Sequence, residues 1–170
     1  MRLFRNLCVL LAVIAAMIST AFAAEMAPLK QQAQTAHYRL ELQIGPTEKM
    51  FTPKEVAAKR LTEGEVMVGG AMSMGMASMA MDMGDTRHLE VHVYSLDKGA
   101  VVTNAKVGIV VTDTASKRAE KVSAAKMYGI KEGPSDIHYG DNVSLPSGNY
   151  TVEVTVNGEK ATFQITIPTA

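Results

Sequence analysis

The residues of this chain best suited to chemistry are its methionines and histidines. The segment AMSMGMASMAMDMG, residues 71–84, holds six of the 12 methionines, namely Met72, Met74, Met76, Met79, Met81 and Met83. Thioether sulfur is a soft, uncharged donor that favours Cu(I), and its spacing here does not follow the helical period of 3.6. The segment therefore indicates a loop that collects Cu(I). The alternative is a mobile loop that docks on a hydrophobic partner.

Two of the four histidines flank an acidic residue in the segment RHLEVHVY, residues 87–94. The alternation is typical of a strand, so the side chains of His88, Glu90 and His92 project from one face while the intervening apolar side chains point to the core. At a rise of ~3.3 Å per residue, the two histidines stand ~13 Å apart, too far to bind one ion. Glu90 can share an ion with one of them, leaving the other for a second site or for none. The alternative is an ordinary solvated sheet face.

A further histidine motif lies in the C-terminal half. Here His138-Tyr139-Gly140 is followed by Asn142 and then by Gly148-Asn149-Tyr150. Together with His88-Leu89-Glu90, this motif resembles the periplasmic high-affinity iron-uptake accessory family. Its members are secreted copper-binding β-sandwich proteins that work beside a bacterial iron permease.

The resemblance implies one metal site. Its ligands would be the nitrogens of His88 and His138, a carboxylate oxygen of Glu90 and a weak axial sulfur of Met127. The family supplies another histidine late in the chain, where this sequence reads VNGEKATFQITIPTA and has none. Candidate additional ligands are His37, His92, Met67 and the six methionines of residues 71–84.

The N-terminus predicts export to the periplasm. Residues 1–23 combine two arginines, an apolar run and the small-residue site Ala21-Phe22-Ala23, as secretory signal peptides do. The only cysteine, Cys8, lies in this segment, so the mature protein would have neither disulfides nor cysteine ligands. Losing two of the 17 basic residues leaves 15 against 17 acidic ones, a formal charge of −2. This composition does not indicate a nucleic-acid-binding surface.

The remaining sequence predicts an all-β fold. Residues 24–36 are polar and aperiodic and predict a disordered leader, followed by a strand at 37–44 and a capped helix at 52–61. Further strands are expected at 64–68, 89–96, 106–112, 120–126, 150–156 and 161–167, with a hairpin turn at Asn157-Gly158. The pattern indicates an immunoglobulin-like antiparallel β-sandwich with one short N-terminal helix, as a single domain over residues 37–170 with the methionine-rich loop 71–84.

The sequence therefore predicts a periplasmic metal-binding protein and not an enzyme. Its metal would be copper, as Cu(I) or Cu(II), with iron as the alternative. Its partner would be a membrane metal permease, and the resemblance also suggests a homodimer. The competing hypothesis is a β-sandwich interaction module without metal, which docks a membrane partner through the methionine-rich loop.

Overall fold

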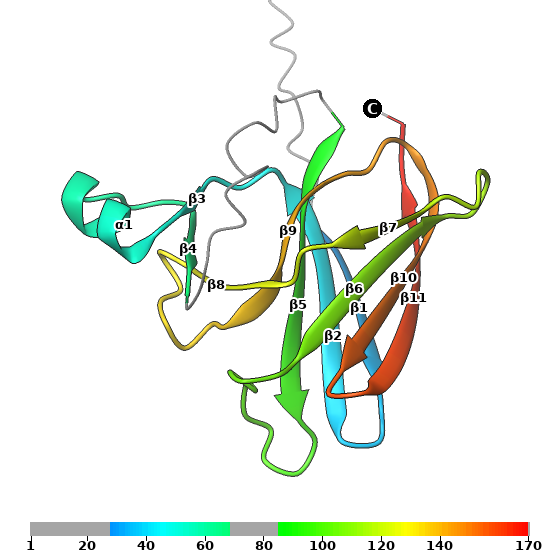
Figure 1. Cartoon of the computed structure of the whole chain (residues 1–170), viewed down its shortest axis with the longest axis horizontal. Coiled ribbons are helices and arrows are strands. Elements are labelled where there is room, and N and C mark those ends of the chain that lie inside the picture. Colours follow the sequence, from blue (N-terminus) through cyan, green and yellow to red (C-terminus); the bar gives the residue numbers. More distant parts are fainter. Residues whose placement is uncertain (1–27, 69–84, 170) are drawn as a thin grey trace, which may run out of the picture.

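The computed structural model describes residues 28–68 and 85–169. The expected signal peptide and the methionine-rich segment 71–84 lie outside these residues. The described chain forms two β-sheets and one short helix, and it is an all-β arrangement (Figure 1).

The larger sheet has seven strands and the smaller sheet has four. In spatial order the larger sheet contains β1 (Leu29–Gln34), β2 (Tyr38–Pro46), β5 (Thr86–Ser95), β9 (His138–Ser144), β8 (Ala125–Gly129), β4 (Glu65–Met67) and β3 (Met50–Phe51). The smaller sheet contains β11 (Glu159–Ile167), β10 (Gly148–Val156), β6 (Val107–Asp113) and β7 (Ala119–Val122). The parallel pair β3–β4 is joined through α1 (Pro53–Lys59), and the other pairs are antiparallel.

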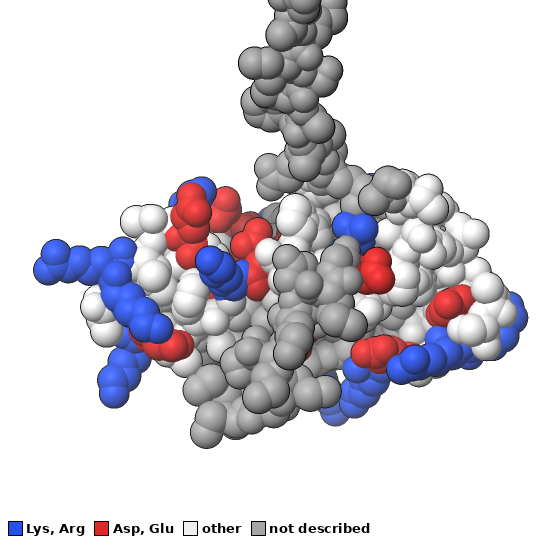
Figure 2. Space-filling view, turned by 90° about the horizontal axis from the view of Figure 1, so that it is seen from above, with Lys and Arg blue, Asp and Glu red and all other residues white. Residues whose placement is uncertain are grey.

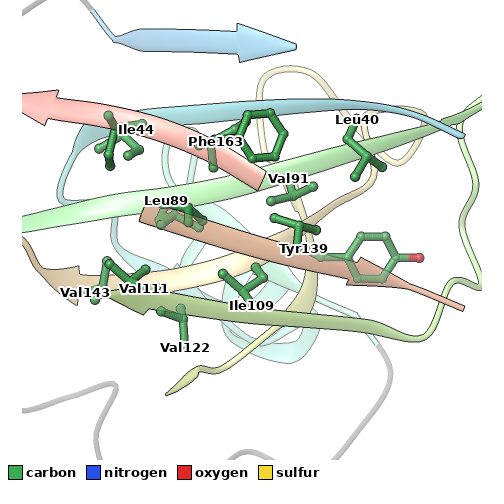
Figure 3. Close-up of a cluster of buried hydrophobic side chains, with 14 of the residues drawn as sticks. Leu40, Ile44, Leu89, Val91, Ile109, Val111, Val122, Tyr139, Val143 and Phe163 are labelled. Atoms are coloured by element: carbon green, nitrogen blue, oxygen red, sulfur yellow. The ribbon is translucent and has the colours of Figure 1, made fainter. Parts of the chain in front are cut away.

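The hydrophobic core combines residues from both sheets. Leu40, Leu89 and Val91 of the larger sheet pack in the same hydrophobic core as Ile109 and Phe163 of the smaller one, as Figure 3 shows. Burying one such side chain contributes roughly 1.5–3 kcal/mol. The predicted direction of the apolar residues of β5 toward the core is confirmed, because Leu89 and Val91 are fully buried.

Two local sequence signals are confirmed. Asn157 and Gly158 have φ angles of 50° and 94° and form the hairpin turn that connects β10 to β11. At the helix start, Thr52 Oγ1 accepts a hydrogen bond from the Glu55 amide at 3.2 Å, while the Glu55 carboxylate accepts one from the Thr52 amide at 2.9 Å. This reciprocal cap begins the helix one residue later, at Pro53.

The prediction of a disordered leader over residues 24–36 is wrong for 29–34. These residues form β1, which pairs with β2 along its whole length. Alternate residues of β1 are half-buried and exposed. An edge strand of this kind is stabilised mainly by its backbone hydrogen bonds to the neighbouring strand, so its side chains can be polar. This polar composition is why the sequence did not indicate a strand.

Two further expectations are corrected. The strand expected at 120–126 is two strands, because the chain passes from β7 in the smaller sheet to β8 in the larger one. Residues 138–144, which lie outside the strands expected from the sequence, form β9 in the middle of the larger sheet. Glycine at position 140 is a poor strand former, but a Cβ there would collide with the backbone oxygen of Leu89. The close approach of β9 to β5 therefore requires glycine.

The helix α1 has seven residues, and no helix in the described part of the chain is long and apolar enough to cross a membrane. Basic and acidic side chains are interspersed on the face seen in Figure 2.

Candidate metal centre

Strand β5 carries its polar residues on the face opposite the core. His88, Glu90 and His92 are only 3%, 6% and 8% exposed. An ordinary solvated face is therefore excluded. Charged and titratable groups that are this deeply buried need a partner, because removing them from water is costly.

Strand β9 brings His138 to these residues. Glu90 lies opposite Gly140 and His88 opposite Asn142, so the same register continued by one pair on that face places His138 opposite His92. The ring centroid of His138 lies 6.0 Å from that of His88 and 5.2 Å from that of His92. His138 thus stands between two histidines that cannot share an ion directly.

Strand β4 adds Glu65, which the sequence analysis missed. One Glu65 carboxylate oxygen lies 3.2 Å from His138 Nε2, and a Glu90 oxygen lies 3.5 Å from the same nitrogen and 3.8 Å from His88 Nε2. One ligand atom from each of Glu65, His88, Glu90 and His138 lies within 4.8 Å of the others. We call these four residues the buried cluster.

Outer hydrogen bonds orient both imidazoles of the buried cluster. His138 Nδ1 lies 3.1 Å from the backbone oxygen of Asp136, which can only accept, so Nδ1 carries the proton. His88 Nδ1 lies 3.1 Å from Asn142 Oδ1. The Asn142 amide is held by the backbone of Glu48, whose N–H donates to Oδ1 at 3.2 Å and whose oxygen accepts from Nδ2 at 2.7 Å. In its neutral form each histidine therefore carries its proton on Nδ1 and directs Nε2 to the cluster, as metal-binding histidines do.

Three atoms of the buried cluster have no hydrogen-bond partner among the described residues. They are Glu65 Oε2, His88 Nε2 and His138 Nε2. The 3.2 Å approach of Glu65 to His138 lacks hydrogen-bond alignment. Each unpaired buried group costs ~1–3 kcal/mol. A cation among these atoms would satisfy all three, so the buried cluster could hold a metal ion.

Burial sets the protonation of this face. It raises the pKa of Glu90 to about 7 and lowers the pKa values of His88 and His92. Burial also disfavours charge on His138, but the carboxylates of Glu65 and Glu90 outweigh it and raise the pKa of that histidine. A metal ion would instead stabilise ionised Glu90 and neutral imidazoles, because these are the ligating forms.

His92 belongs to a second group beside the buried cluster. Its Nε2 lies 3.2 Å from Asp136 Oδ1. Ligand atoms of His92, Asp136 and His138 lie within 4.8 Å of one another. His138 is therefore common to both groups.

The other sequence candidates are placed as follows. Met127 is fully buried on β8 directly opposite His138, and Met67 on β4 lies opposite Met127. The side chains of both methionines therefore project from the same sheet face as that of His138. His37 belongs to neither group, since its Nδ1 pairs with Glu159 at 2.6 Å and its side chain is 69% exposed. The six methionines of 71–84 lie outside the described residues.

A cavity of about 880 Å³ opens over this face. His88, His92 and His138 line it together with seven carboxylates and two lysines. The carboxylates are those of Glu41, Glu48, Glu63, Glu65, Glu90, Glu132 and Asp136. This excess of acidic groups attracts cations and raises their local concentration.

The signal for Glu65 in the sequence is weak. Alternation within residues 64–68 predicts that Glu65 and Met67 share a strand face. No local feature indicates that this strand reaches His138, because the contact depends on the intervening β8 and on the pairing of β8 with β9.

Comparisons of the chain with family models, with curated proteins and with solved structures return no match. The resemblance to the iron-uptake accessory family accordingly stays a prediction.

Proposed function

We propose that this protein binds copper in the buried cluster. The observation that carries the proposal is the convergence of three buried donor atoms without partners, on Glu65, His88 and His138, beside the carboxylate of Glu90. The two histidines are already held in the ligating tautomer by acceptors outside the cluster.

Copper fits this donor set well. Two imidazole nitrogens and two carboxylates suit borderline divalent ions, and Cu(II) binds such sites most tightly of the first-row divalent metals. Met127, opposite His138, places a thioether on the same face for Cu(I). Iron, which also accepts imidazole and carboxylate, is the alternative cargo. When bound, the ion would supply the positive charge that this acidic face lacks.

The proposed role is that of a periplasmic accessory to a membrane metal permease or to copper handling. It is supported by the signal-peptide pattern of residues 1–23 and by the resemblance carried by His88-Leu89-Glu90 and His138-Tyr139-Gly140. The methionine-rich segment 71–84 would collect Cu(I) close in sequence to His88.

We also propose that the two sheets form an immunoglobulin-like sandwich. The orders β2-β5-β9-β8 and β11-β10-β6 correspond to the ABED and GFC orders of immunoglobulin domains. Tyr150, near the start of β10, donates its hydroxyl hydrogen bond to the Pro146 backbone oxygen at 2.8 Å. A tyrosine corner of this kind supports the assignment.

Metal titration of the purified, metal-free protein tests the copper proposal. We expect the His88→Gln/His138→Gln double variant to lose tight Cu(II) binding, whereas His37→Gln retains it because His37 pairs with Glu159 away from both groups. Replacing the six methionines of 71–84 by leucine is expected to weaken mainly Cu(I) binding. Unchanged binding of both ions in all variants would instead support the interaction module.

A further inference from the structure

His92 and Asp136 form a polar pair that the buried cluster does not use. The pair shares the cavity with the cluster, and His92 Nδ1 is buried without a hydrogen-bond partner among the described residues. Together with His138, this pair offers two imidazole nitrogens and one carboxylate oxygen, a ligand set for a cation whose remaining positions water can fill.

We propose that His92 and Asp136 form a second, more exposed cation position, which passes an ion to the buried cluster through the shared His138. The inference rests on the proposed metal binding and adds the route by which the ion enters and leaves.

Exposure along the three side chains supports this direction. The Asp136 side chain is 37% exposed, that of His92 is 10% exposed and that of His138 is 1% exposed. The three residues thus lead from solvent to the interior. An incoming hydrated ion meets the carboxylate first, where losing water is least costly, and meets the most buried imidazole last.

The geometry allows transfer without full release of the ion. Ligand atoms of His92 and Asp136 lie within 4.8 Å of His138, and so do those of Glu65, His88 and Glu90. An ion that holds His138 can therefore exchange one set of partners for the other. Metal–ligand bonds form and break, any proton on Glu90 is released to solvent as the ion enters the buried cluster, and no electron is transferred.

A rate measurement distinguishes this position from an ordinary structural pair. Metal-free wild type is mixed with Cu(II) alone in a stopped-flow instrument, and the loaded protein is then mixed with excess chelator to follow release. The dissociation constant is measured separately by competition. The variants are His92→Gln and Asp136→Asn. The matched control is Glu48→Gln, which removes a carboxylate from the same cavity but from neither group.

We expect His92→Gln to slow uptake and release together by about tenfold or more while the dissociation constant changes by less than about threefold, because a transfer position lowers barriers in both directions and leaves the end states alone. Asp136→Asn should act in the same sense. Glu48→Gln should lower only the uptake rate, because it weakens the negative electrostatic potential that attracts cations to the cavity. Asp136 is exposed enough for its variant to fold if His92→Gln does not.

Two results would overturn the transfer position. One is unchanged uptake and release rates in both variants. The other is a larger dissociation constant, that is a weaker affinity, with an unchanged uptake rate. This result would make His92 a ligand of the final site. A wild-type protein that binds no Cu(II) would refute the proposed function itself, so the two failures are distinguishable.

Discussion

Replacing Glu90 by glutamine should stabilise the metal-free protein. Burial raises the pKa of Glu90 from 4.5 to about 7, so the folded protein holds the proton more tightly than the unfolded chain does. At ~1.36 kcal/mol per pKa unit, ionising this carboxyl in the folded state costs about 3 kcal/mol. For this acid, folding stability is greatest when Glu90 is protonated and is lost as the pH rises from 4.5 through 7.

The assay is thermal and denaturant unfolding of chelator-treated protein at two pH values. At pH ~8, Glu90→Gln should raise the free energy of unfolding by about 3 kcal/mol and Tm by about 10 °C. At pH ~5 the gain should fall below about 1 kcal/mol, because the wild-type carboxyl is then protonated. With Cu(II) added, the order should reverse, since the variant lacks a ligand.

The control is Glu153→Gln, which removes a half-exposed carboxylate that pairs with Lys160 at 2.7 Å. A surface pair of this kind contributes less than about 1 kcal/mol, so the control should change little at either pH. The reasoning would be refuted if Glu90→Gln destabilised the metal-free protein at pH ~8, or if its effect were the same at both pH values.

Three other predictions concern the same face. Asn142→Ala removes the acceptor that orients His88 and should weaken Cu(II) binding about 10- to 100-fold in a chelator competition, whereas an unchanged affinity would separate Asn142 from the site. Gly140→Ala should force β9 from Leu89 and lower the unfolding free energy by about 1–3 kcal/mol in urea; a wild-type midpoint would contradict it. Cu(II) affinity should fall at least about tenfold per pH unit below pH ~7, because the ion must displace the proton of Glu90 and also that of His138 once this histidine is charged; pH-independent titrations would argue against it.

Part of the site was predictable because a strand has a fixed period. Alternation placed His88, Glu90 and His92 on one face, and the rise per residue correctly separated the two histidines into different groups. The burial of that face was not predictable. Polar side chains are typical of a solvated surface, and whether other elements close over them depends on the whole fold.

The missed residues show the same limit. Glu65 enters the buried cluster only because β3, α1 and β4 return the chain to the far edge of the sheet, beside β8. Residues 138–144 have weak strand propensity, yet they pair between β5 and β8, where Gly140 permits close approach. Pairing with neighbouring strands outweighs intrinsic preference at such positions.

The sequence by itself determined the all-β class, the hairpin at Asn157-Gly158, the helix cap at Thr52 and the shared face of His88, Glu90 and His92. These features depend on local dihedral preferences and on a two-residue period, so a short window contains all the information. Only the tertiary structure decided that His138 and Glu65 join that face and that Asn142 orients His88. Those contacts connect residues far apart in the chain, and strand order and register, which no single segment encodes, set their distances.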